Sequence, residues 1–171
     1  MEHEQGKKAE KQSQKEAENK QVVVFKLEEE EFGIDIYLVR EVLKMLPITA
    51  LPNTDMFIEG VINIRGAVIP VIDLCKRFSL SEERTNLTRI IIVEISGEQV
   101  GLIVNAVSEV LMIDGEKIQP PPSRMTGGHT ELLEGVARCD DRLIILLKVE
   151  NLLSSQEVID LEGIKQSKVT Q

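Results

Sequence analysis

The stretch GVINIRGAVIPVIDL, residues Gly60 to Leu74, decides the fold of this chain. It reads as two alternating strands joined by the dipeptide Arg65-Gly66, which is the pattern of a β-hairpin. Gly66 can take the positive φ that closes such a turn, and Asn63 can cap backbone groups beside it. The hairpin leaves Arg65 at its rim, where an arginine serves either as a solubilising charge or as a five-donor fork for a partner's carboxylate or carbonyl.

Short β-branched runs continue on both sides of this hairpin. With GVINI and AVIPVI of the hairpin itself, the runs from Val22 onward are VVVF, GIDI, IIIV, GLIV and LIILL, each bounded by Gly, Asp, Asn or charged residues. This spacing predicts a mainly β protein made of many short strands. We expect helices only as short pieces near residues 53–58, 73–78 and 150–154.

The chain also resembles itself. Residues 22–45 match residues 90–113 at an offset of 68, and residues 57–61 match residues 132–136 at an offset of 75. The offset is seven residues larger in the second match, and an insertion in the Pro/Gly-rich stretch 120–128 explains this increase, because loops tolerate added length. Unless the similarity arises by chance between β-rich segments, it predicts two similar β modules that share a core, because one module of about 65 residues is marginal alone.

Composition excludes several classes of function. The net charge is −9, and residues 1–20 carry five lysines and five acidic residues, so the excess lies on the rest of the chain. This charge repels phosphate backbones, and 3% aromatic content gives few stacking platforms, so nucleic acid is a poor partner. We expect no membrane span, no signal peptide, a cytoplasmic location, and free thiols at Cys75 and Cys139.

Catalytic groups are scarce in the sequence. His3 and His129 have no metal-ligand spacing, Gly127-Gly128 lacks a P-loop ending, and the acidic run 28–31 fits a hairpin turn better than a calcium loop. We therefore expect no catalytic residue, cofactor or metal. The rival prediction, a small β-barrel enzyme, requires a pocket lined by titratable groups with perturbed pKa values.

The hairpin residues resemble the hallmark of the CheW family, G-V-x-N-x-R-G-x-x-x-P-V-x-D-L. Every fixed position of that string is present, as Gly60, Val61, Asn63, Arg65, Gly66, Pro70, Val71, Asp73 and Leu74. The resemblance covers about residues 21–155. It implies two SH3-like five-stranded β-barrel subdomains on a shared hydrophobic core, preceded by a flexible charged tail (1–20) and followed by a partly helical or disordered segment (156–171).

The resemblance also implies a function. Members of this family are non-catalytic adaptors that couple methyl-accepting chemoreceptors to the histidine kinase CheA at membrane receptor arrays; an adaptor of a chemosensory pathway other than motility is the alternative. The implied receptor-facing residues are Val39, Glu41, Arg65 and Val110, although Val39 and Val110 fit core packing equally well. The implied kinase-facing residues are Ile48, Met56, Phe57 and Gly60.

Overall fold

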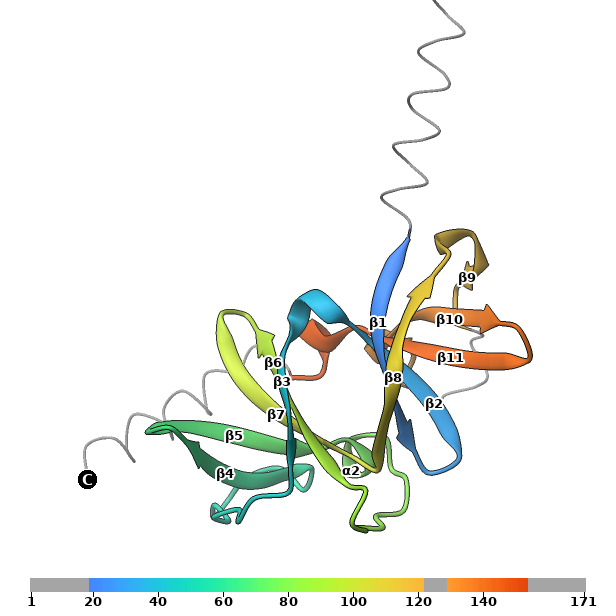
Figure 1. Ribbon diagram of the computed structural model, residues 1–171. Coiled ribbons are helices and arrows are strands. Elements are labelled where there is room, and N and C mark those ends of the chain that lie inside the picture. The colour runs from blue at the N-terminus through green and yellow to red at the C-terminus, as the bar shows by residue number, and fades with distance from the viewer. Residues whose placement is uncertain (1–18, 122–128, 154–171) are drawn as a thin grey trace, which may run out of the picture.

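Two β-sheets make up the computed structural model, which describes residues 19–121 and 129–153 (Figure 1). Sheet A has the strand order β8 (Ala106–Ile113), β1 (Lys20–Leu27), β2 (Glu30–Asp35), β11 (Arg142–Leu147), β10 (Leu133–Cys139) and β9 (Ile118–Gln119). Sheet B has the order β3 (Val39–Lys44), β6 (Arg89–Ile95), β7 (Glu98–Val104), β5 (Ala67–Asp73) and β4 (Ile58–Ile64). The predicted mainly β class is confirmed, and sheet A adds the two-residue strand β9 to the expected five.

Helical structure in the described residues is short. It consists of α2 (Leu74–Arg77) and the 3-10 turns η1 (Ile36–Leu38), η2 (Gly115–Lys117), η3 (Thr130–Leu132) and η4 (Val149–Asn151). The predicted pieces at 73–78 and 150–154 overlap α2 and η4, and residue 154 lies outside the described residues. The piece predicted at 53–58 is wrong: Asn53 follows a proline, takes a φ of +58°, and begins a turn that leads into β4.

Hydrogen-bond register confirms the internal repeat. In the β1–β2 hairpin Val22 pairs with Asp35, and 68 residues later Ile90 pairs with Ile103 in the β6–β7 hairpin. In the β4–β5 hairpin Ile58 pairs with Ile72, and 75 residues later Leu133 pairs with Leu147 in the β10–β11 hairpin. The β4–β5 and β10–β11 hairpins each carry a β-bulge immediately after their first residue pair, so this irregularity is repeated as well.

Strands three to five of each repeat join the sheet that holds the first hairpin of the other repeat. Repeat one supplies β1 to β5 and repeat two supplies β6, β7, β8, β10 and β11, yet β3 pairs with β6 in sheet B and β8 pairs with β1 in sheet A. Figure 1 shows β8 lying along β1, while β3 crosses to the sheet that holds β6 and β7. Each sheet therefore contains strands of both repeats, and neither repeat can complete a sheet by itself.

Three clusters of buried apolar side chains fill the described part of the chain. Alternate residues of β6 belong to two different clusters. Ile90 and Ile92 belong to a cluster inside sheet B, whereas Ile91 and Val93 belong to the largest cluster. That largest cluster takes residues from both sheets, including Phe25 of sheet A, and the third cluster lies inside sheet A. The predicted shared core is confirmed, and both cysteines are free thiols as expected.

The ends of the domain differ slightly from the predicted boundaries. Lys20, assigned to the tail, is already the first residue of β1. The rest of the predicted tail up to residue 18, the insertion residues 122–128, and the predicted C-terminal segment 156–171 lie outside the described residues. No described helix has the length and apolar character needed to cross a membrane.

Glycines permit the bulges of the two equivalent hairpins. Gly60 has a φ of +147°, and a Cβ atom there would lie 2.0 Å from the carbonyl oxygen of Thr49. At its counterpart Gly135, a Cβ atom would lie 2.6 Å from the carbonyl oxygen of Gln119. Both glycines therefore let a neighbouring segment pair closely with the hairpin, as the bridge between Thr49 and Val61 and the short strand β9 show.

Replacing Gly60 with alanine should lower the free energy of unfolding by about 3 kcal/mol or more, because the new methyl group meets backbone that cannot move aside. Gly66→Ala is the matched control, since Gly66 also has a positive φ (+85°) but open space around it, and should cost about 1 kcal/mol. Urea denaturation of both variants measures the difference. Equal losses would show that the close approach at Gly60 is unimportant.

Candidate functional site: the Arg65 tip, its partner strand and the ion-pair cluster at the hairpin base

The turn between β4 and β5 holds Arg65 in a fixed, exposed position. Arg65 and Gly66 have φ values of +50° and +85°, as a tight two-residue hairpin turn requires. The Gly66 N–H donates to Asn63 Oδ1 at 3.0 Å, which confirms the predicted capping role of Asn63. The Arg65 side chain is 76% exposed.

Glu41 on β3 orients the Arg65 guanidinium. Nη2 of Arg65 lies 2.8 Å from Glu41 Oε1 and 3.0 Å from Glu41 Oε2. An exposed pair of this kind adds little stability. Its effect is to orient the fork, whose Nε and Nη1 atoms have no partner among the described residues.

A second arginine–glutamate pair, in sheet A, is more fully engaged. Glu109 is the counterpart of Glu41 in the repeat, and its Oε1 lies 2.6 Å from Nη1 of Arg142. Arg142 also donates through Nε and Nη2 to Glu31 Oε2, at 3.0 and 2.7 Å. The hydrogen bonds to Glu31 and Glu109 raise the pKa of Arg142. Arg142 is thus held by two carboxylates and Arg65 by one, so the Arg65 fork is the more available of the two.

Of the residues expected to face the receptor, Glu41 and Arg65 are brought into contact. Val39 lies on the same strand as Glu41 but is half-buried against the shared core. Val110 lies on β8 in the other sheet and is 48% exposed. Sequence reasoning missed Val42, the repeat counterpart of Val110, which is 41% exposed; the offset of 68 pairs these two positions.

The four residues expected to face the kinase have different environments. Met56 is 87% exposed, whereas Phe57 is half-buried, with the Arg77 guanidinium 4.8 Å above its ring centroid. Ile48 packs against the core of sheet B, and Gly60 is buried at the bulge. Next to Ile48, a shallow pocket of about 380 Å³ is lined by Leu46, Pro47, Thr49, Val61, Ile62, Asn63 and Val68.

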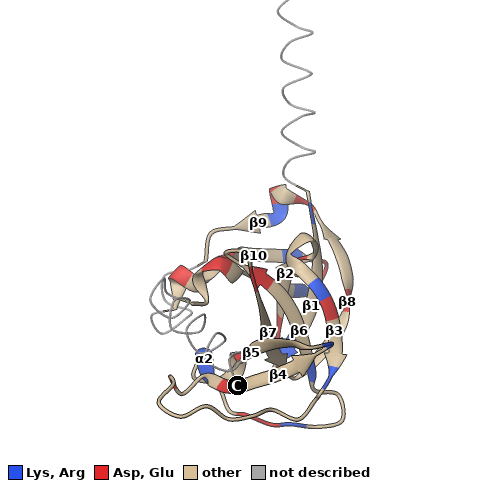
Figure 2. Ribbon diagram, turned by 90° about the vertical axis from the view of Figure 1, so that its left-hand side faces the viewer, with Lys and Arg blue, Asp and Glu red and all other residues tan. Residues whose placement is uncertain are grey.

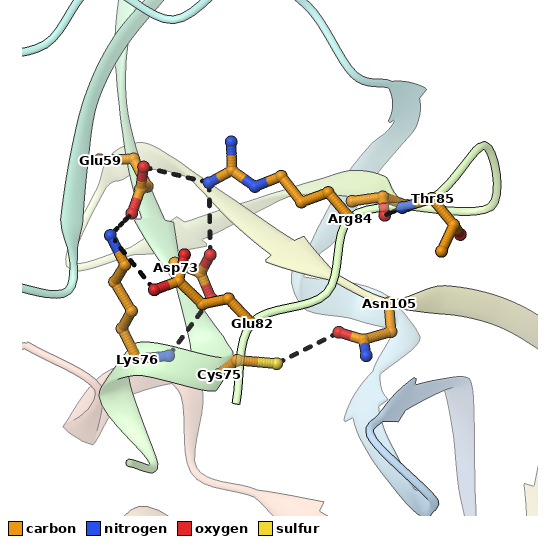
Figure 3. Close-up of polar contacts among 9 residues, drawn as sticks. Glu59, Asp73, Cys75, Lys76, Glu82, Arg84, Thr85 and Asn105 are labelled. Atoms are coloured by element: carbon orange, nitrogen blue, oxygen red, sulfur yellow. Dashed lines mark hydrogen bonds and ion pairs between the residues drawn. The ribbon is translucent and has the colours of Figure 1, made fainter. Parts of the chain in front are cut away.

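A cluster of ion pairs fixes the base of the hairpin (Figure 3). Asp73 is only 3% exposed and caps α2, accepting from the Lys76 N–H at 3.3 Å. Arg84, from the segment that joins the repeats, lies 3.3 Å from Asp73 Oδ2 and 3.0 Å from Glu59 Oε2. Lys76 pairs with Glu59 and, at 3.5 Å, with Glu82.

This arrangement gives Asp73, the aspartate of the hallmark string, a structural role. The Glu59, Asp73 and Glu82 oxygens lie within 4.8 Å of one another, a spacing that could suit a metal ion. Lys76 and Arg84 stand among them, however, and already supply positive charge. The cluster therefore ties β4, β5, α2 and the inter-repeat segment together.

Titration in this region is dominated by burial and by these cations. Burial acts to raise the pKa of Glu59, but hydrogen bonds and charge from Lys76 and Arg84 outweigh it, so the pKa is lowered. Burial, followed by the charges of Asp73, Glu28 and Glu82, raises the pKa of the Cys75 thiol to about 11. The Cys75 Sγ atom also lies 3.1 Å from Asn105 Oδ1. Cys75 is therefore a protonated, buried thiol at neutral pH, unlike an activated nucleophile.

The exposed features of the site are an arginine fork and isolated apolar side chains on a rigid two-sheet scaffold. These are the features of a protein-binding domain. The family model described as CheW-like domain matches residues 21–157. The chain belongs to the CheW-like domain family.

Individual relatives agree with this assignment. The chain is 36% identical to the chemotaxis protein CheW of Klebsiella aerogenes over 85% of this chain and 88% of that protein. It is 32% identical to the chemotaxis protein CheW of Bacillus subtilis over 83% of this chain and 88% of that protein. The crystal structure of the scaffolding protein TtCheW from Thermoanaerobacter tengcongensis has 49% identity and a TM-score of 0.75, covering 81% of this chain and 90% of that chain. The predicted class, a coupling adaptor of chemotaxis, is confirmed.

Glu59→Gln should lower the free energy of unfolding at pH 7 by about 1 kcal/mol, because it removes the charge that binds Lys76 and Arg84. Since the folded-state pKa is lowered, this stabilisation is present above the unfolded value of 4.5 and is lost as the pH falls through the folded value. Urea denaturation at pH 7 and near pH 3 should therefore show a smaller effect at the lower pH.

The control for this pH dependence is Glu29→Gln, which changes an exposed glutamate in the turn between β1 and β2. It should have little effect at either pH. If Glu59→Gln cost the same at both pH values, packing rather than charge would account for the loss.

Proposed function

We propose that this chain joins the cytoplasmic tips of methyl-accepting chemoreceptors to the regulatory domain of the histidine kinase CheA, without catalysing a reaction itself. The observation that carries the proposal is the Arg65 fork, oriented by Glu41 and only partly engaged, in a chain of the CheW-like family. Binding to receptor tips would recruit the chain to membrane receptor arrays.

The receptor contact is proposed at the edge where β3 and the β4–β5 tip lie together. Arg65 can add bonds to a partner's carboxylate or carbonyl through Nε and Nη1, and Glu41 keeps the fork in one orientation. Val110 and Val42 offer exposed apolar area on the two exchanged strands. Val39 contributes by packing the base of β3 against the shared core.

The kinase contact is proposed at the other end of β4, around Met56. An unbranched, largely exposed methionine adapts to an irregular partner surface. Phe57, next to Met56 in the chain, and Ile48 add partly buried apolar surface, and Gly60 fixes the bulge that brings residues 48–50 close to β4. Leu46, at the rim of the adjacent shallow pocket, enlarges this surface.

Coupling between these two contacts follows from their shared strand. Residues of β4 connect the Met56 end to the Arg65 tip, and the ion pair to Glu41 links the tip to β3. A receptor that prefers one arrangement of this edge would change the free energy of kinase binding, and the reverse effect would be equal in size.

Arg65→Glu should weaken co-sedimentation with receptor tips at least tenfold while leaving the unfolding midpoint nearly unchanged, because an exposed charge is reversed beside another acid. Arg138→Glu is the matched control, since Arg138 is exposed on β10 in the other sheet. Equal receptor binding by the folded Arg65→Glu and Arg138→Glu proteins would overturn the proposed contact.

A charge-swapped protein, Arg65→Glu with Glu41→Arg, separates recognition from structure. If receptors bind the Arg65 fork directly, the swap should fail to restore receptor binding although it restores the ion pair. Full recovery would instead mean that only the link between β3 and the hairpin tip matters.

A further inference from the structure

The last turn of α2 carries two neighbouring cations, Lys76 and Arg77, which differ in their partners. Lys76 pairs with Glu59 and Glu82. Arg77 is partly exposed and makes no ion pair with any residue of 19–121 or 129–153. Figure 2, in which Lys and Arg are blue, shows this basic surface at α2. The positive charge of Arg77 is therefore available to a partner.

Two contacts hold the Arg77 guanidinium in place. Its Nε donates to the carbonyl oxygen of Leu152 at 2.9 Å, and its central carbon lies 4.8 Å from the centre of the Phe57 ring. Leu152 is fully buried at the end of repeat two, so the acceptor is itself fixed. Neither a carbonyl nor an aromatic ring neutralises the charge. The Nη1 and Nη2 groups keep their donors free within the described part of the chain.

The fold does not require an arginine at this corner. The offset of 75 relates Phe57 to Leu132 and Arg77 to Leu152. The backbone is equivalent in the two repeats, because the carbonyl oxygens of Phe57 and Leu132 each accept a hydrogen bond at 2.8 Å from matching N–H groups. Leu132 and Leu152 are nevertheless buried apolar side chains. Repeat two thus builds the same corner from two leucines, whereas repeat one places a charged fork over an aromatic ring.

An exposed apolar side chain lies next to this fork. Met56 is 87% exposed and directly precedes Phe57 in the chain. Asp55 belongs to the same turn, where its carbonyl accepts from the Ile58 N–H at 3.0 Å, but its carboxylate makes no ion pair with Arg77. Arginine and aromatic residues beside apolar surface are enriched at the contacts that dominate binding energy in protein interfaces.

We propose that Arg77 is a contact residue of the kinase-facing surface, where its Nη groups bind a carboxylate of the kinase regulatory domain beside Met56 and Phe57. The contact depends on the proposed kinase surface at Met56, and it defines the chemistry of the partner as an acidic side chain next to an apolar one. Since Leu152 and Phe57 already orient the guanidinium, little side-chain entropy is lost when the carboxylate binds.

Calorimetric titration of the full chain with the CheA regulatory domain, at low and at high salt, tests this contact. Arg77→Gln should weaken binding about tenfold at low salt, because glutamine can still donate to a carbonyl but carries no charge. The loss should fall to about threefold or less at high salt, because salt screens a partly exposed pair of charges. Equal losses at both salt concentrations would mean that Arg77 only positions Phe57, and this would overturn the proposal.

Arg89→Gln is the matched control. The Arg89 guanidinium also binds backbone carbonyls, those of Asn86 and Thr88 at 2.9 Å each, and it has no ion pair with a described residue, but it lies at the start of β6. The control should leave kinase binding unchanged. A loss equal to that of Arg77→Gln would reveal a general effect of net charge and would also overturn the proposal.

Met56→Ser separates this contact from the proposed function. If Met56→Ser weakens kinase binding and Arg77→Gln does not, the kinase surface stands and the Arg77 contact is wrong. If neither variant weakens binding, the kinase binds elsewhere and both proposals are wrong.

Urea denaturation shows whether each variant folds. A folded Arg77→Gln protein that is less stable but binds the kinase normally would place the role of Arg77 inside the fold, which contradicts the proposal. If Arg77→Gln does not fold, Arg77→Lys replaces it. Lysine keeps the charge but cannot bind a carboxylate through two nitrogens, so binding should weaken about threefold at low salt, and normal binding would count against the contact.

Discussion

The hydrogen bonds that β1 and β6 make to the third strand of the opposite repeat are the constraint on which the structure depends. Each sheet is built from strands of both repeats, so the two repeats cannot separate without breaking strand pairs. The inner faces of the two sheets meet in the largest apolar cluster, which takes residues from both sheets. A duplicated module too small to bury a core of its own becomes one cooperative unit.

The same exchange determines where recognition can occur. Glu41 reaches sheet B only because β3 has crossed to it, and there it meets the tip of the β4–β5 hairpin. The tip is held at its turn by Asn63, and its base is held by Asp73 and Arg84. The exposed guanidinium is therefore supported at both ends of a short hairpin, which lowers the entropy lost when a partner binds it.

Much of this could be predicted from sequence, since the Arg65-Gly66 turn, the repeat with its offsets, and the shared core all follow from local chemistry or self-similarity. The strand exchange could not, because β3 and β8 are similar in sequence, so local pattern does not reveal which sheet each one joins. Arg84 was missed because it lies in an irregular polar segment with no periodicity. The helix expected at 53–58 failed because backbone geometry at Pro52-Asn53 prevailed over apolar spacing.

Glu41 and Glu109 are counterparts in the repeat, but the arginines that they bind are not, since the offset of 75 relates Arg65 to Asp140 and Arg142 to Ala67. In sheet A, Arg142 is bound by Glu31 and Glu109, and its loss would leave two carboxylates without their cation. In sheet B the residue matching Glu31 is the neutral Gln99, and Arg65 pairs with Glu41 alone. Natural selection can therefore alter the exposed Arg65 tip to suit new partners at little cost to folding, because only one exposed ion pair is lost.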